Sequence, residues 1–436
     1  MTLSGSPHPS AFNVNGRSYR PPLCPVVVIC LDGSADEYFD AAIGHERMPH
    51  LQQMSVQGYR GLARAALPSF TNVNNSSIVT GAPPSVHGIS GNFFYDKSTG
   101  QEVMMNSAKY LRAETILAAA ARSGRKVAVV TAKEKLRDIF AAGLVGQPPA
   151  GHNGIAFSSE KANQATLECH GIADVEQIVG RPTPAIYSPE ASLYVLWAGV
   201  ALLQQERADF LYLSTTDFMQ HKFSPDSQES LDFYAAIDRE LGRLLQLGAI
   251  VGVTADHGMN AKQRSDGSPN VIYLESELTK KFGAGFRVIL PITDPYVAHH
   301  GALGSYAVVH LPNSQPDAAR ARLANSVRDW LLALPGVTEV HERSTAATKL
   351  ELPADRLGEI VVLSGRDVVL GRTPEYHDLS VLQSGLRSHG GRYEEMVPFI
   401  ISEPLLPAYA VKAAGDPRNF DIFDFTINGT QRTKPE

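Results

Sequence analysis

Four short apolar runs, each followed by polar residues, constrain the fold of this chain more than any other feature. The runs occupy residues 26–31, 126–132, 210–213 and 249–255. Apolar, mostly β-branched runs without polar alternation are typical of strands buried on both faces of a parallel sheet. Segments with helical periodicity separate them, at about 112–123, 190–206 and 227–247. This alternation predicts an α/β core with a mostly parallel central sheet between helices.

A stretch with a different pattern interrupts this core. Short strand-like runs surround a helical segment at 316–334, and these runs lie at 271–274, 286–292, 306–311 and 359–364. We therefore expect residues 1–262 and 376–436 to form the catalytic core and residues 263–375 to form a smaller inserted α+β domain. The strand-like run at 396–402 is expected to return to the main sheet.

Composition excludes several classes of protein. With 39 basic and 45 acidic residues, the formal net charge is −6, and without a basic block the chain is a poor candidate for binding nucleic acid. No apolar run approaches the roughly 18 to 20 residues of a membrane-spanning helix. The first 25 residues contain no apolar core typical of a secretory signal, so we expect a cytoplasmic protein. Three cysteines are too few for a disulfide framework.

Carboxylates and histidines gather where the predicted strands end. Asp32, Asp217 and Asp256 each follow an apolar run, His221 lies four residues after Asp217, and His257 directly follows Asp256. The carboxyl ends of parallel strands meet at one edge of a sheet, and a mixed set of oxygen and imidazole ligands suits zinc and related metals. Each pattern alone has an ordinary explanation, such as a turn, a surface helix pair or a loop. Their joint occurrence favours a metal site.

A hydroxyl lies at the start of a predicted helix. The segment 67–81 is expected to turn, begin a short helix at about Thr71 and stop at Gly81. The Thr71 hydroxyl is either an N-cap or a nucleophile beside a metal and a helix N-terminus. Farther along, the amide of Asn92 could donate a hydrogen bond to a developing oxyanion.

These chemistry-bearing residues follow one another in a recognisable order. The set is Asp32, Thr71, Thr80-Gly81, His87-Gly88, Asn92, Asp217, His221, Asp256-His257-Gly258 and His389. It resembles the alkaline phosphatase superfamily, and more narrowly the nucleotide pyrophosphatase/phosphodiesterase branch and the related phosphonoacetate hydrolases. The resemblance spans nearly the whole core and implies an alkaline-phosphatase-like fold in which the insertion caps the metal site.

The same resemblance implies two zinc ions per chain and a role for each residue. One ion would be bound by Asp217, His221 and His389, and the other by Asp32, Asp256, His257 and the Thr71 hydroxyl. Thr71 would be the nucleophile, and Asn92 would hold the phosphoryl group.

Lys133 and Lys135 follow the second apolar run and raise the question of substrate. Two lysines at this place could begin a solvated helix, or they could both reach a ligand carboxylate. Phosphonoacetate hydrolases resemble this chain here too, and their paired lysines bind the substrate carboxylate. His299 and His300, in the insertion, could line the cap side of the pocket or lie on the surface.

The expected function is therefore hydrolysis of the carbon–phosphorus bond of phosphonoacetate to acetate and phosphate, through a phosphothreonine. A phosphodiesterase or phosphomonoesterase with the same metals is the alternative, and a metal-binding protein without catalysis is an alternative of another class. The expected partner is a small-molecule phosphonate, and we expect the protein to bind neither nucleic acid nor membrane. A homodimer is the assembly that we consider for the chain.

Overall fold

A seven-stranded sheet forms the centre of the computed structural model, which describes residues 10–145, 154–294, 300–312, 317–382 and 385–433. The strands, in spatial order, are β4 (Tyr59–Arg64), β19 (Met396–Ile401), β10 (Ile250–Thr254), β3 (Val26–Cys30), β9 (Phe210–Ser214), β7 (Val127–Thr131) and β8 (Ile155–Ser158). The five strands from β10 to β8 run parallel. β19 is antiparallel to both of its neighbours. The predicted α/β fold with a mostly parallel sheet is confirmed.

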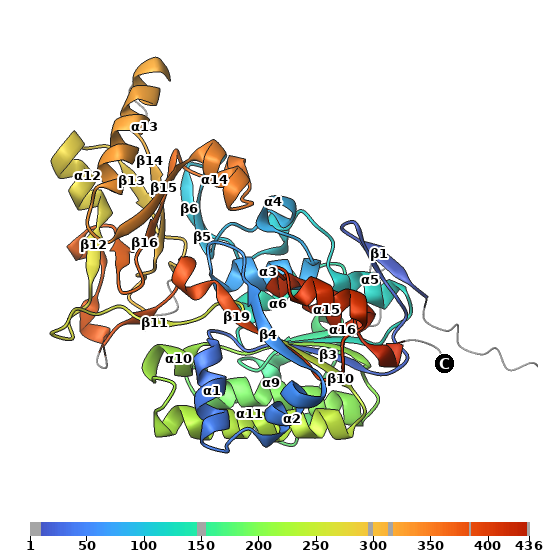
Figure 1. Cartoon of the computed structure of the whole chain (residues 1–436). Helices are drawn as coiled ribbons and strands as arrows, with labels where there is room; N and C mark the ends of the chain where they lie inside the picture. The colour runs from blue at the N-terminus through green and yellow to red at the C-terminus, as the bar shows by residue number, and fades with distance from the viewer. Residues whose placement is uncertain (1–9, 146–153, 295–299, 313–316, 383–384, 434–436) are drawn as a thin grey trace, which may run out of the picture.

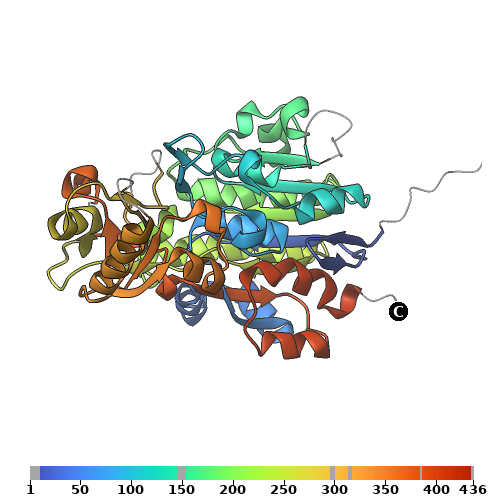
Figure 2. The same ribbon diagram turned by 90° about the horizontal axis from the view of Figure 1, so that it is seen from above.

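Helices cover both faces of this sheet, because its central strands are apolar on both sides. In β3, Val27 and Ile29 belong to one core cluster and Val26 and Val28 belong to the other. The first face packs against α1 (Asp36–Gly44), α2 (Pro49–Gln57), α9 (Pro189–Gln204) and α11 (Gln228–Gln246). The second packs against α3 (Thr71–Thr80), α5 (Ile116–Arg122), α6 (Glu134–Phe140) and α16 (Ile422–Asn428). The three layers are visible in Figure 1 and, from above, in Figure 2.

A second, antiparallel sheet of four strands lies beside the main body, at the upper left of Figure 1. Its order is β13 (Arg287–Ile289), β14 (Tyr306–His310), β16 (Ile360–Ser364) and β15 (Val337–Glu342). It packs with α12 (Leu274–Phe282), α13 (Asp317–Leu332) and α14 (Arg343–Lys349). All of these elements fall within residues 263–375, although the boundaries of an inserted domain stay a prediction.

The expected strand at 271–274 lies outside this second sheet. It forms β12 (Val271–Tyr273), which pairs in parallel with β17 (Val369–Gly371). The core of the second sheet also includes residues that precede or begin α3, namely Ala66, Leu67, Phe70 and Val73. The start of α3 is therefore held between the two parts of the molecule.

Shorter elements complete the described chain. The strands are β1 (Phe12–Val14), β2 (Arg17–Tyr19), β5 (Phe93–Asp96), β6 (Gln101–Met104), β11 (Asn260–Ala261) and β18 (Arg387–Ser388). The helices are α4 (Pro84–His87), α7 (Leu167–His170), α8 (Val175–Val179), α10 (Phe218–Lys222) and α15 (Pro407–Ala413). Among the described residues, none of the helices has the length and apolar character needed to cross a membrane.

His87, at the end of α4, is fully buried in its neutral form. Its Nδ1 accepts a hydrogen bond from the Ile89 backbone at 3.1 Å, so its Nε2–H faces the Ser77 hydroxyl at 2.8 Å. Burial, together with the charge of Arg356, lowers the pKa of His87 to about 3. The unfolded chain, with an ordinary histidine pKa near 6.5, therefore takes up a proton before the folded chain does.

We expect this histidine to make folding stability fall as the pH drops below about 6.5, with the loss complete near pH 3. Between pH 7 and pH 4.5 the contribution is about 3 kcal/mol. His87→Gln should remove that part of the pH dependence in urea unfolding measured at the two pH values. The exposed His45 supplies the control, since His45→Gln should keep the wild-type dependence. An unchanged pH dependence in His87→Gln would contradict the assignment.

Candidate active site

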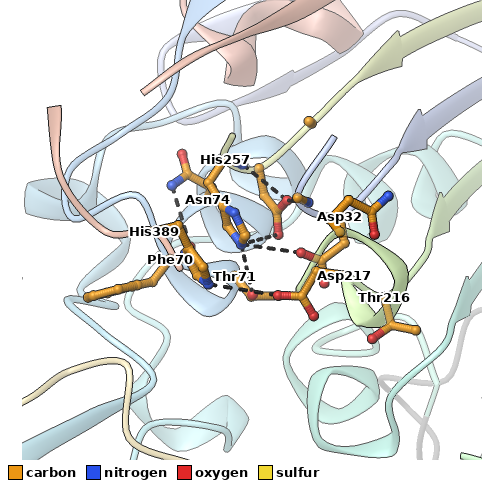
Figure 3. A network of polar contacts seen from close by, with 12 residues as sticks. Asp32, Phe70, Thr71, Asn74, Thr216, Asp217, His257 and His389 are labelled. Carbon is orange, nitrogen blue, oxygen red and sulfur yellow. Dashed lines mark hydrogen bonds and ion pairs between the residues drawn. The ribbon is translucent and has the colours of Figure 1, made fainter. Parts of the chain in front are cut away.

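Two clusters of carboxylates and histidines lie at the carboxyl edge of the main sheet, as the strand-end pattern predicts. Asp32 follows β3, while Asp217 and Asp256 follow its two neighbours, β9 and β10. The clusters are Asp217, His221 and His389, and Asp32, Asp256 and His257. Within each cluster the ligand atoms lie within 4.8 Å of one another, and all six residues are buried. Figure 3 shows four of these side chains converging on one region.

The three histidines of these clusters share one orientation. In His221, His257 and His389, Nδ1 lies within hydrogen-bond distance of a backbone carbonyl. The carbonyls are those of Arg387, Gly258 and Ser69, at 2.7, 2.9 and 2.8 Å. Because a carbonyl can only accept, each Nδ1 carries the hydrogen, and Nε2 is the atom that each ring can offer to a metal.

Asp32 gives a further test of whether these residues fit a cation. Its carboxylate is fully buried, yet neither oxygen accepts a hydrogen bond from any residue that the structure describes. His257 Nε2 lies 3.2 Å from one oxygen, and the Lys133 ammonium lies 3.8 Å from the other. A buried carboxylate without hydrogen bonds is costly unless it meets positive charge. The residues present therefore fit a bound metal ion.

The protonation of the second cluster reflects its crowded charges. Burial raises the pKa of Asp256 well above its ordinary value, and the neighbouring Asp32 raises it further. Burial alone would lower the pKa of His257, but Asp256 and Asp32 outweigh it and raise that pKa to about 9. The crowded carboxylates of this cluster therefore favour a positive charge beside them.

Thr71 is the first residue of α3, as predicted, and its side chain faces the second cluster. The residue before it, Phe70, occupies the N-cap position, and Thr71 Oγ1 lies 3.4 Å from His257 Nε2. Thr71 is almost fully buried, at 3% exposure. The helix ends at Thr80, because the next residue, Gly81, has a left-handed backbone (φ 63°). The hydroxyl is therefore directed at the cluster rather than at the N-cap position.

Asn92 lies close to the start of the same helix and is also buried. Its side-chain oxygen accepts a hydrogen bond from the backbone N–H of Asn72 at 3.0 Å. This contact orients the amide, so the NH2 group is the end of the side chain that can act as a donor.

The two lysines after β7 are largely buried rather than solvated, and Lys133 lies beside the clusters. Lys133 Nζ lies 3.0 Å from Asp217 Oδ1, and the Lys135 ammonium pairs with Asp294. Each lysine side chain is 13% exposed. Counter-charges from Asp217 and Asp32 raise the pKa of Lys133 although burial opposes this, whereas burial and Lys133 lower the pKa of Lys135.

A cavity of about 330 Å³ adjoins these lysines. Its lining includes Lys133, Lys135, Thr216, Asp294, Ile186 and Tyr187. The sequence did not single out Asp294 or Tyr187, because each comes from a loop far from the motifs. For Thr216 the sequence offered one signal, its place in the short polar segment that ends at Asp217.

The inserted stretch also reaches the first of the two clusters. His300 is buried at 4% exposure, and its ring centroid lies 5.5 Å from that of the cluster residue His221. Its burial rules out the surface alternative for this residue. His299 lies outside the described residues.

Comparisons with known proteins agree with this geometry. Residues 26–392 match the type I phosphodiesterase / nucleotide pyrophosphatase family. A crystal structure of phosphonoacetate hydrolase from Sinorhizobium meliloti in complex with phosphonoformate is 46% identical, with a TM-score of 0.89. The match covers 96% of this chain and 98% of that one. The phosphonoacetate complex of the same enzyme has a TM-score of 0.88, with the same identity and coverage.

More distant relatives share parts of this similarity. Venom phosphodiesterase from Naja atra is 26% identical over 252 residues, which make up 54% of this chain. The match spans only 26% of that relative's length. Murine ectonucleotide pyrophosphatase / phosphodiesterase 5 shares the fold, with a TM-score of 0.59 and 16% identity. That match covers 94% of this chain and 96% of the murine one. This chain is a hydrolase that belongs to the type I phosphodiesterase / nucleotide pyrophosphatase family, within the alkaline phosphatase superfamily.

Proposed function

We propose that this protein hydrolyses the carbon–phosphorus bond of phosphonoacetate, giving acetate and phosphate. The observation that carries the proposal is that two largely buried lysines, Lys133 and Lys135, line one cavity, and that Lys133 also contacts the cluster residue Asp217. They offer positive charge where a leaving-group carboxylate would lie. The similarity at 46% identity to a phosphonoacetate hydrolase supports the same substrate.

The two clusters would hold two zinc ions. Asp217, His221 and His389 would bind one ion, and Asp32, Asp256, His257 and the Thr71 hydroxyl would bind the other. Carboxylate oxygens and imidazole nitrogens are common zinc ligands. When bound, such ions neutralise phosphonate oxygens and lower the pKa of a hydroxyl or water that they hold.

The residues of the chain then account for the two steps of the reaction. The Thr71 hydroxyl gives up its proton to water, its oxygen attacks phosphorus to form the new O–P bond, and the electron pair of the P–C bond passes to carbon. The neighbouring carboxylate spreads this charge as an enolate-like dianion, which Lys133 and Lys135 stabilise before carbon takes up a proton to give acetate. Asn92 donates to a phosphoryl oxygen. Water then attacks the phosphothreonine, which releases phosphate and restores the Thr71 hydroxyl.

Lys135→Ala should separate substrates by their leaving group. We expect it to lower kcat/KM for phosphonoacetate about 100-fold, the effect of losing one hydrogen bond between charged groups. Hydrolysis of nitrophenyl phosphate, which has no carboxylate at that place, should fall less than about 10-fold. Lys135 is the sharper probe of the two lysines, because Lys133 contacts the proposed metal ligand Asp217, whereas Lys135 pairs with Asp294, which belongs to neither cluster.

Lys161 supplies the matched control for this substitution. It lines the same cavity but is exposed, so Lys161→Ala should leave both activities near the wild-type level. Equal losses on both substrates in Lys135→Ala would remove the carboxylate-binding role from the proposal.

A phosphodiesterase or phosphomonoesterase with the same nucleophile is the second candidate, and the family match favours it. It would use the same clusters and Thr71 but no carboxylate contact. A panel of phosphonates, phosphate monoesters and diesters distinguishes the two functions. Only a phosphonoacetate hydrolase would release phosphate from phosphonoacetate as its dominant activity. A non-catalytic metal-binding protein would hydrolyse none of them.

A further inference from the structure

Asn75 lies one helical turn after Thr71 in α3 and is fully buried. We propose that Asn75 is a positioning residue that holds Asp256 and the nucleophile-bearing start of α3 in a set arrangement. The inference rests on the proposed function in one respect, since it takes Asp32, Asp256 and His257 to bind a metal ion.

Both ends of the Asn75 amide are engaged. Nδ2 donates to the Thr71 carbonyl and to Asp256 Oδ2, each at 3.0 Å. Because a backbone carbonyl can only accept, these contacts identify the NH2 end of the amide. Oδ1 then accepts from the Tyr212 hydroxyl at 2.7 Å and from the Ser214 hydroxyl at 2.9 Å. Both hydroxyls belong to β9, which also leads to Asp217.

These contacts complete the support of the Asp256 carboxylate. Its Oδ1 accepts from the backbone N–H groups of Gly33 and His257, each at 3.1 Å. Its Oδ2 accepts from Asn75 and lies 3.8 Å from His257 Nε2. Asn75 is therefore the side-chain donor to the oxygen that lies on the histidine side of the cluster.

One NH2 group thus joins the backbone of the proposed nucleophile to a proposed metal ligand. Since Asn75 and Thr71 belong to the same helix, a shift of α3 relative to the end of β10 would break the bond to Asp256. The Tyr212 and Ser214 hydroxyls oppose rotation of the amide, because the reversed amide would place its oxygen against Asp256 and the Thr71 carbonyl. Hydrogen-bonded partners that orient metal ligands commonly contribute 10- to 100-fold to metal affinity or activity.

The experiment measures metal binding directly, with Co²⁺ as the probe in the full-length, metal-depleted protein. The visible absorption of bound Co²⁺ reports ligand geometry, and competition with a chelator reports affinity. We expect Asn75→Ala to weaken Co²⁺ affinity at only one of the two sites, by about 10- to 100-fold. The absorption of that site should change with it.

Asn74 is the matched control, since it is the neighbouring residue in α3 and is equally buried. Its side chain bonds to both backbone groups of Ala66, to the Phe70 carbonyl and to Asn419, and it contacts no member of either cluster in the described structure. Asn74→Ala should therefore leave the Co²⁺ affinities and spectrum unchanged. A spectral change of equal size in Asn74→Ala would overturn the proposal, because it would show a general effect of loosening α3.

Tyr212→Phe keeps the experiment decisive if Asn75→Ala does not fold. It removes one oxygen, while the ring stays packed against Phe140 and Phe423. We expect a weakening of the same site in the same direction, of about 10-fold or less. Wild-type Co²⁺ binding in both Asn75→Ala and Tyr212→Phe would overturn the inference alone, whereas a wild-type protein that binds no Co²⁺ would overturn the proposed metal site itself.

Discussion

Thr71→Ala is expected to abolish turnover of phosphonoacetate, with kcat falling by about 10⁴-fold or more. The substitution removes the only atom assigned to attack phosphorus, and metal ligation by the carboxylates and histidines remains. Thr71 Oγ1 lies within 3.4 Å of His257 Nε2 and is buried where the metals would bind. Steady-state phosphate release, together with metal analysis of the variant, measures both parts of this expectation.

Two further variants make the result specific to the Thr71 hydroxyl. Thr71→Ser keeps a hydroxyl at the same place and should retain measurable turnover. Thr80→Ala removes a hydroxyl at the other end of α3, where it bonds to the Ser76 carbonyl at 2.7 Å, and should keep most of the activity. Full activity in Thr71→Ala would exclude Thr71 as the nucleophile.

Removal of the metals should have a similarly large effect. Prolonged treatment with a strong chelator, followed by dialysis, is expected to lower turnover by about 1,000-fold or more, since metal ions supply several kcal/mol of charge stabilisation in such reactions. Adding Zn²⁺ should restore activity as about two ions per chain are taken up. Metal analysis and activity measured on the same samples test the two together.

A ligand variant distinguishes metal binding from general stability. Asp217→Ala removes one carboxylate of the first cluster and should lower both metal content and activity. Asp238 is also buried, but its carboxylate accepts hydrogen bonds from the backbone N–H groups of His50 and Leu51, and neither residue belongs to a cluster. Asp238→Ala should therefore lower thermal stability and keep both ions. Unchanged activity after verified metal removal would rule out a metal-dependent mechanism.

The central sheet was predictable to the extent that its strands are apolar on both faces. The run at 26–31 becomes β3, and the other three runs become β7, β9 and β10. The edge strand β4, with the sequence YRGLAR, is partly exposed and has no apolar run. It forms because β19 offers an antiparallel partner along its full length, a tertiary contact that local periodicity does not encode.

The candidate site, like the sheet, could be predicted only in part from the sequence. Asp32, Asp217 and Asp256 meet because they follow adjacent parallel strands, and this follows from the strand pattern alone. His389 returns from the far end of the chain, so its place beside His257, with ring centroids 3.5 Å apart, could be expected only from the family resemblance. Asp294 beside Lys135 carried no local signal, because the contact depends on how the inserted stretch packs on the core.

The most direct test of the account follows phosphonoacetate itself by phosphorus NMR in the presence of the zinc-loaded protein. The account predicts that the phosphonate signal is replaced by that of inorganic phosphate, with one acetate formed for each phosphate, and that neither appears with Thr71→Ala. A protein that holds both metal ions and hydrolyses phosphate esters, but leaves the phosphonoacetate signal unchanged, would contradict it.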